Sequence, residues 1–186
     1  MDQDKEIQEK LELGEGPKLH IGGKEVKEGW KILNAQEKEG VDYVQDIRDL
    51  SDFHDNQFIA IYASHILEHL GYQNDLKKVL SDIYRILKPG GKFFVSVPDL
   101  DTLCQIFVHP QANLDIRYDV MRILYGGQLD KYDFHYVGFN AEILVYFLNR
   151  AGFHDIYRVP EFGFFNDTSS LRLGENLISL NVIATK

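Results

Sequence analysis

The chain has 186 residues and a formal net charge of −9, from 20 Lys and Arg against 29 Asp and Glu. This length suits one domain with a sizeable buried core. The acidity argues against a protein whose main partner is nucleic acid, because phosphate neutralisation needs basic patches. No apolar run approaches the roughly 20 residues that a membrane-spanning helix needs. The single cysteine, Cys104, excludes an intrachain disulfide and favours a cytoplasmic location. We expect a protein that handles a small molecule, with no membrane or nucleic-acid partner and with a homodimer left open.

The amino-terminal third predicts short strands between turns. Residues 1–17 form a polar lead-in with one short helix, which we expect within 5–13. Apolar runs bounded by glycine and polar residues predict the next elements. These are strands at 18–21, 30–33 and 43–44.

Residues 58–98 form a β-α-β unit. An apolar strand at 58–63 runs directly into a polar segment that starts at Ser64. Helical spacing follows, with one apolar face that is stopped by Pro89-Gly90-Gly91, and a second strand is expected at 92–97. That face contains Leu76, Val79, Leu80, Ile83, Ile86 and Leu87. Polar residues at the carboxyl end of a parallel strand mark the usual ligand side of an open α/β sheet.

The remainder predicts three more helices and two strands. Helices are expected at 100–108 and 114–124, followed by a polar and aromatic loop at 125–139. A third helix begins after its cap Asn140 and ends at Gly152. Strands follow at 154–159 and 177–185. Residues 18–186 are thus predicted as a single domain with a helical insertion at about 99–139.

Two segments together carry a family resemblance. Ser64-His65-Ile66-Leu67-Glu68-His69, followed by Arg85-Ile86-Leu87-Lys88-Pro89-Gly90-Gly91, resembles the class I S-adenosylmethionine-dependent methyltransferases, in the small bacterial methyltransferase type 11 branch. The resemblance implies an α/β, doubly wound, Rossmann-like sheet of seven strands, with helices on both faces. It implies the strand order 3-2-1-4-5-7-6 with strand seven antiparallel, and S-adenosylmethionine as the cofactor.

The resemblance also implies a set of cofactor-binding residues at the strand ends. Glycine suits the first loop because a ligand approaches the backbone closely there. The chain departs from the family at this loop, which has only two adjacent glycines, and at the end of strand two, where Asn34 replaces the usual acidic residue. The implied residues are His20, Gly22, Gly23, Asn34, Asp46, Ser64 and His65.

Histidines are the candidates for catalysis. His135, in the Tyr132-Asp133-Phe134-His135 segment, and His65 are the two residues that could take a proton from an acceptor, because histidine titrates near neutral pH. The four-residue spacing of His65 and His69 allows a metal site in principle. We expect instead that Glu68 and His69 have structural roles and that no metal is bound.

These patterns predict methyl transfer to a small-molecule acceptor by in-line displacement. The acceptor pocket is expected between the insertion at 99–139 and the loop at 161–176, whose aromatic residues would line it. The alternative is a non-catalytic binding or scaffold protein with a degenerate cofactor site, favoured by Asn34 and the short glycine loop. A dehydrogenase is weaker, because no Gly-x-Gly-x-x-Gly loop follows the first strand.

Overall fold

A computed structural model describes residues 2–186 of the chain. Two 3-10 turns, η1 (Leu67–His69) and η2 (Thr168–Ser170), accompany the regular elements. The helices are α1 (Asp2–Leu11), α2 (Asp75–Ile86), α3 (Leu100–Val108), α4 (Leu114–Tyr125) and α5 (Ala141–Ala151). The strands are β1 (Lys18–Ile21), β2 (Trp30–Asn34), β3 (Tyr43–Val44), β4 (Phe58–Ser64), β5 (Leu87–Pro98), β6 (His154–Val159), β7 (Arg172–Leu173), β8 (Asn176–Leu177) and β9 (Ser179–Thr185).

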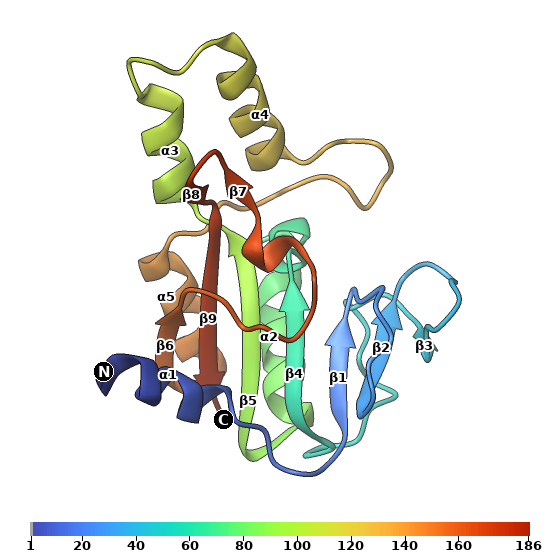
Figure 1. Ribbon diagram of the computed structural model, residues 1–186. Coiled ribbons are helices and arrows are strands. Elements are labelled where there is room, and N and C mark those ends of the chain that lie inside the picture. Colours follow the sequence, from blue (N-terminus) through green and yellow to red (C-terminus); the bar gives the residue numbers. More distant parts are fainter. Residues whose placement is uncertain (1) are drawn as a thin grey trace.

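Seven of these strands form one twisted sheet in the order β3-β2-β1-β4-β5-β9-β6 (Figure 1). The pairs from β3 to β5 are parallel, and β9 runs antiparallel between β5 and β6. This confirms the predicted strand order, with β9 as the seventh strand of that sheet. The short antiparallel pair β7-β8 stands apart from it and was not predicted.

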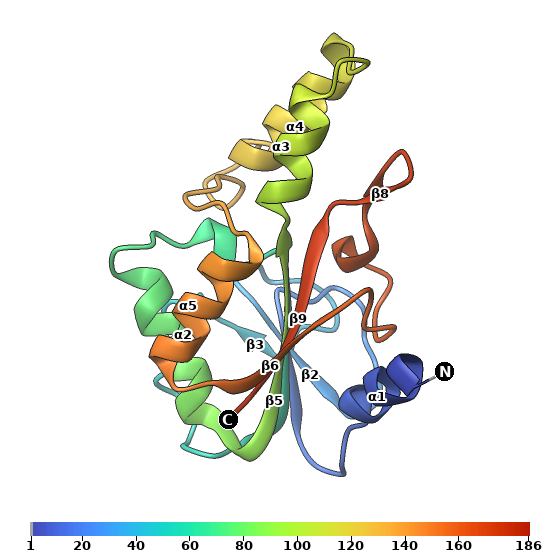
Figure 2. The same ribbon diagram turned by 90° about the vertical axis from the view of Figure 1, so that its left-hand side faces the viewer.

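The two faces of the sheet are covered differently (Figure 2). Helices α2 and α5 lie side by side on one face, over a core that includes Leu33, Ile61 and Phe93. The other face is covered by α1 and by the segment 160–165, over Tyr62 and Phe94. Helices therefore occur on both faces, as expected, but one of the two layers consists largely of a loop.

The connections among the first four strands contain no helix among the residues that the structure describes. Parallel strands usually need a crossover of a dozen or more residues, commonly a helix. Here residues 22–29 join β1 to β2 and residues 35–42 join β2 to β3. The loop at 45–57, between β3 and β4, covers the sheet with Leu50 and Phe53, both of which are buried.

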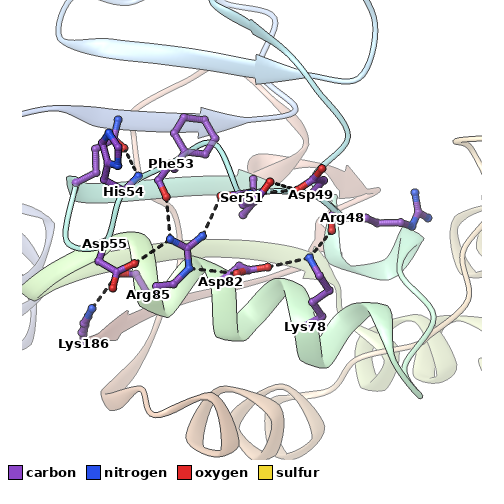
Figure 3. Close-up of polar contacts among 12 residues, drawn as sticks. Arg48, Asp49, Ser51, Phe53, His54, Asp55, Lys78, Asp82, Arg85 and Lys186 are labelled. Atoms are coloured by element: carbon purple, nitrogen blue, oxygen red, sulfur yellow. Dashed lines mark hydrogen bonds and ion pairs between the residues drawn. The ribbon is translucent and has the colours of Figure 1, made fainter.

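Arg85, at the end of α2, holds that 45–57 loop in place (Figure 3). Its guanidinium donates to the carbonyl oxygens of Phe53 at 2.8 Å and Leu50 at 2.9 Å, and it pairs with Asp55 at 3.0 Å. Two turns earlier, Lys78 donates to the carbonyl of Arg48 at 2.6 Å. Arg85 thus attaches to α2 a connection between parallel strands that is commonly a helix.

Helices α3 and α4 form a hairpin that projects away from the sheet beyond the end of β5 (Figures 1 and 2). This is the helical insertion that the sequence predicts. Cys104 lies on α3 and is exposed. Within the described residues, no helix has the length and apolar character to cross a membrane.

Candidate active site

A cavity of about 620 Å³ opens at the carboxyl ends of β1, β2, β3 and β4. Its walls come from the strand ends, from the segment 64–70 and from the loop at 130–135, which extends above the sheet (Figure 1). Of the predicted site residues, the lining includes Gly22, Asn34, Asp46, Ser64, His65 and His135. Its volume lies within the ~300–1,000 Å³ that small-molecule sites usually enclose.

The two glycines of the first loop have different surroundings. Gly22 has φ of +77°, a left-handed conformation, and a Cβ there would lie 2.2 Å from Ile66 Cδ1. A Cβ on Gly23 would lie 2.6 Å from the ring of His20. Gly22 therefore shapes the cavity wall, whereas Gly23 leaves room for His20.

His20 is absent from the cavity lining. It is 4% exposed, and its ring packs against Tyr62 and Phe165, at centroid distances of 5.0 and 4.0 Å. Burial lowers the pKa of His20 to about 4, against smaller opposing effects of Asp167 and Glu25. The ring is thus a neutral member of the aromatic core on the sheet face that α1 covers.

Asn34 and Asp46 both line the cavity, but their side chains already have partners. Asn34 Nδ2 donates to the carbonyl of Gly23 at 3.1 Å, and its Oδ1 accepts from the main-chain N–H of Gln36 at 3.0 Å. Asp46 pairs with Arg48 at 3.0 Å. Asn34 therefore fixes the glycine loop, and the ion pair of Asp46 sets one wall of the cavity.

Arg48 is a site residue that sequence reasoning missed. Besides Asp46, it pairs with Asp75 at 3.3 Å and donates to the carbonyl of His69 at 3.1 Å. It thus joins the end of β3 to the turn after β4 and itself lines the cavity. The only sequence signal was a basic residue two positions after an aspartate, which is too common to be specific.

Ser64 and His65 connect the end of β4 to the distant turn η2. Ser64 Oγ lies 3.2 Å from Thr168 Oγ1, and Ser179 Oγ donates to the carbonyl of Thr168 at 2.7 Å. Since that bond uses the hydroxyl proton of Ser179, its oxygen accepts from His65 Nε2 at 2.9 Å. His65 therefore carries its proton on Nε2.

The other ring nitrogen of His65 faces Glu68. The distance from Nδ1 to Glu68 Oε1 is 3.5 Å, and Glu68 is 1% exposed. Burial lowers the pKa of His65 to about 4 and raises that of Glu68 to about 8. Residue 65 also has φ of +52°, a strained conformation for a non-glycine residue. Backbone strain and shifted pKa values both cluster at functional sites.

His69 and His135 meet at the opposite side of the cavity. Their ring centroids are 4.6 Å apart, and His69 Nδ1 donates to the carbonyl of Phe134 at 3.1 Å. The main-chain N–H of Tyr136 donates to the carbonyl of Glu68 at 2.7 Å. Burial lowers the pKa of both histidines, that of His135 to about 4. No sequence pattern indicated that His69 and His135 are neighbours, because they are 66 positions apart.

The aromatic residues of the 161–176 loop do not line this cavity. Phe162, Phe164 and Phe165 pack on the sheet around Trp30 and Tyr62, so their predicted role in an acceptor pocket was wrong. Together with α1 they cover the apolar surface on this face of the sheet. From that loop only Thr168 reaches the cavity, and Tyr132 is the one aromatic side chain of the predicted pocket in its lining.

Comparisons with known proteins agree with this geometry. Residues 23–95 match the family model described as a methyltransferase domain. No curated protein sequence matches the chain. Similar solved structures include an S-adenosylmethionine-dependent methyltransferase from Archaeoglobus fulgidus, at 17% identity and TM-score 0.59, covering 100% of this chain and 92% of that one. Another is from Thermotoga maritima and is described as a possible histamine N-methyltransferase. It has 20% identity and TM-score 0.56, and the match covers 95% of this chain and 87% of that one.

A third similar structure is a 1,6-didemethyltoxoflavin-N1-methyltransferase from Burkholderia thailandensis. It has 17% identity and TM-score 0.57, and covers 92% of this chain and 72% of that one. That protein was solved with its acceptor and S-adenosylhomocysteine bound.

The sheet order, together with a cavity at the carboxyl ends of its parallel strands, defines the class I S-adenosylmethionine-dependent methyltransferase fold. The match of residues 23–95 to the methyltransferase-domain model agrees with the resemblance to type 11 methyltransferases inferred from the sequence.

Proposed function

We propose that this protein transfers a methyl group from S-adenosylmethionine to a small-molecule acceptor bound in the cavity at the strand ends. The observation that carries the proposal is the cavity itself, which lies at the ligand side of the sheet and is lined by polar groups at both ends.

The cofactor end lies between β1 and β3. Gly22 presents main chain in a left-handed turn, and Asp46 supplies a carboxylate at the lining. Ser64 lies at the end of β4, where its hydroxyl could bind the amino-acid part of the cofactor. Asn34 contributes indirectly, through its bond to Gly23, and His20 supports the loop from behind. These residues fit a nucleoside-sized ligand, although the family's ribose-binding carboxylate is replaced by Asn34.

The acceptor end lies toward the 130–135 loop. The sulfonium of the bound cofactor supplies an already activated methyl group, so the chain has to orient the acceptor and exclude water; good orientation can contribute about 7–11 kcal/mol. His135 faces this end with a neutral ring and is the proposed base for a hydroxyl or amine acceptor. His65 donates to Ser179 and faces Glu68, so we assign it to positioning the β4 turn.

Thermal unfolding with and without ligand tests the proposal. Ligand at 100 times its dissociation constant should stabilise the protein by about 2.7 kcal/mol. A clear upward shift of the midpoint with S-adenosylmethionine and S-adenosylhomocysteine is expected, and adenosine monophosphate is the control. No shift at millimolar ligand would reject the enzyme and favour the non-catalytic alternative.

A further inference from the structure

Three side chains at the base of the acceptor end form a cluster that the proposed methyl transfer does not explain. One ligating atom from each of Glu68, His69 and His135 can be chosen so that all three lie within 4.8 Å of one another. Glu68 and His69 belong to η1, and His135 comes from the loop after α4. The main-chain bond from Tyr136 to Glu68 fixes the two segments to each other.

The carboxylate of Glu68 is the observation that points to a ligand. It is 1% exposed, and neither of its oxygens accepts a hydrogen bond among the residues that the structure describes. Its nearest basic neighbour is the lone-pair nitrogen of His65, at 3.5 Å. A buried carboxyl group without donors is costly unless a cation or another partner compensates it.

The histidines are oriented as metal-ligating histidines usually are. A metal-binding imidazole commonly donates its second ring N–H to a main-chain carbonyl, which fixes the tautomer. His69 does so, because a carbonyl oxygen can only accept, and Nδ1 must therefore carry the proton that bonds Phe134. The lone pair of the neutral ring is then on Nε2. His135 in turn lies against main-chain groups of Ile123 and Leu124, at the end of α4.

We propose that Glu68, His69 and His135 form a binding site for one divalent transition-metal ion, of which Zn²⁺ is the natural probe. Two imidazoles and one carboxylate are an established ligand set for such ions, and catalytic sites keep a further position open. His69 and His135 line the cavity while Glu68 lies behind them, so the open position faces the acceptor. The ion would bind an acceptor through an oxygen or nitrogen donor.

The metal site itself does not depend on the proposed function. Only its role in binding the acceptor rests on that function. His135 cannot be both the proposed base and a metal ligand, because a lone pair that coordinates an ion cannot also take a proton. With the ion present, an acceptor hydroxyl would be activated by coordination, and the imidazole would act as a ligand.

The test is calorimetric titration of the chelator-treated full-length protein with zinc chloride. We expect one ion per chain, and a tetrahedral or five-coordinate visible spectrum when Co²⁺ replaces Zn²⁺. Glu68→Gln, which keeps the shape of the side chain but removes the anionic ligand, should weaken Zn²⁺ binding by at least the roughly 10–100-fold loss typical of changes to residues that only support the ligands. His69→Ala and His135→Ala should do the same, and circular dichroism will show that each variant is folded.

His154→Ala is the matched control, because His154 is exposed and far from the cluster along the chain, on β6. It should leave Zn²⁺ affinity unchanged. Absence of Zn²⁺ binding at micromolar protein, or equal binding by wild type and Glu68→Gln, would overturn the site. The S-adenosylmethionine thermal shift is measured separately on metal-free protein, so failure of the metal site and failure of the methyltransferase proposal can be distinguished.

Discussion

The side-chain amide of Asn34 donates a hydrogen bond to the carbonyl oxygen of Gly23 over 3.1 Å. This contact joins the end of β2 to the glycine loop after β1. An aspartate at position 34 could accept hydrogen bonds from a ribose, but it could not donate to Gly23. Asn34 thus stands where the family usually has an acidic residue, and its side chain here supports the glycine loop.

Asn34→Asp tests that interpretation. The substitution removes the donor and brings a negative charge toward a carbonyl oxygen, so we expect a loss of about 0.5–1.5 kcal/mol in the free energy of unfolding. Affinity for S-adenosylhomocysteine, measured by calorimetry, should stay equal or fall. Gln36→Ala is the control, because it keeps the main-chain N–H that bonds Asn34. Tighter binding by Asn34→Asp would show instead that position 34 contacts the ribose directly.

Gly22→Ala should damage both stability and cofactor binding. Gly22 has φ of +77°, and the added Cβ would lie 2.2 Å from Ile66 Cδ1. We expect a loss of about 1–3 kcal/mol in the free energy of unfolding, since an L side chain is strained there and the neighbour must move. Urea titration measures it.

The double variant Gly22→Ala with Ile66→Ala separates the two causes. It removes the atoms that the new Cβ meets but keeps the backbone strain. If the double variant were no more stable than expected from independent additive losses, the proposed contact with Ile66 would be wrong.

Much of the fold could be predicted because its strands are local apolar runs with clear ends. The β-α-β unit at 58–98 has a strand, an amphipathic helix and a Gly-Gly stop, each readable within its own residues. The strand order, however, came from the family resemblance. The extension of β5 back to Leu87 was missed, because it depends on pairing with Phe58.

The site was predicted less fully because its contacts join distant segments. The neighbourhood of His69 and His135 and the bond between His65 and Ser179 each join residues more than 60 positions apart. Phe165 looked like a pocket residue, since an aromatic loop has the same composition whether it binds a ligand or covers a sheet. In the structure it packs on the sheet with Trp30 and Tyr62, a contact between segments far apart in the sequence.

Arg85→Ala should release the 45–57 loop from α2. The guanidinium donates to two main-chain carbonyls, those of Phe53 and Leu50, and bonds of this kind to a charged donor contribute about 1.5–3 kcal/mol each in favourable cases. Because the side chain is partly exposed, we expect a total loss of about 2 kcal/mol, measured by thermal unfolding. Hydrogen exchange should rise within 45–57. Lys77→Ala, an exposed residue on the same helix, is the control. Unchanged exchange in the loop would contradict the role assigned to Arg85.

His20 should make the protein less stable as the pH falls from about 6.5 to about 4. The pKa of the buried ring is lowered from 6.5 to about 4, mainly by burial, and Asp167 and Glu25 only partly oppose this. Above pH 6.5 the ring is neutral in both the folded and unfolded states and contributes no pH dependence. Below it, the unfolded chain binds a proton that the folded protein does not, so the free energy of unfolding decreases with pH.

The loss attributable to His20 is on the order of 1–2 kcal/mol between pH 7 and pH 5. Urea unfolding of the wild type and of His20→Leu at these two pH values measures it. The variant should lose less stability over this interval, whatever its stability at pH 7. His154→Leu, at an exposed position, should show the same loss as the wild type. An equal decrease in wild type and His20→Leu would mean that the ring of His20 is protonated in the folded protein, and that its packing against Phe165 is not that of a neutral core residue.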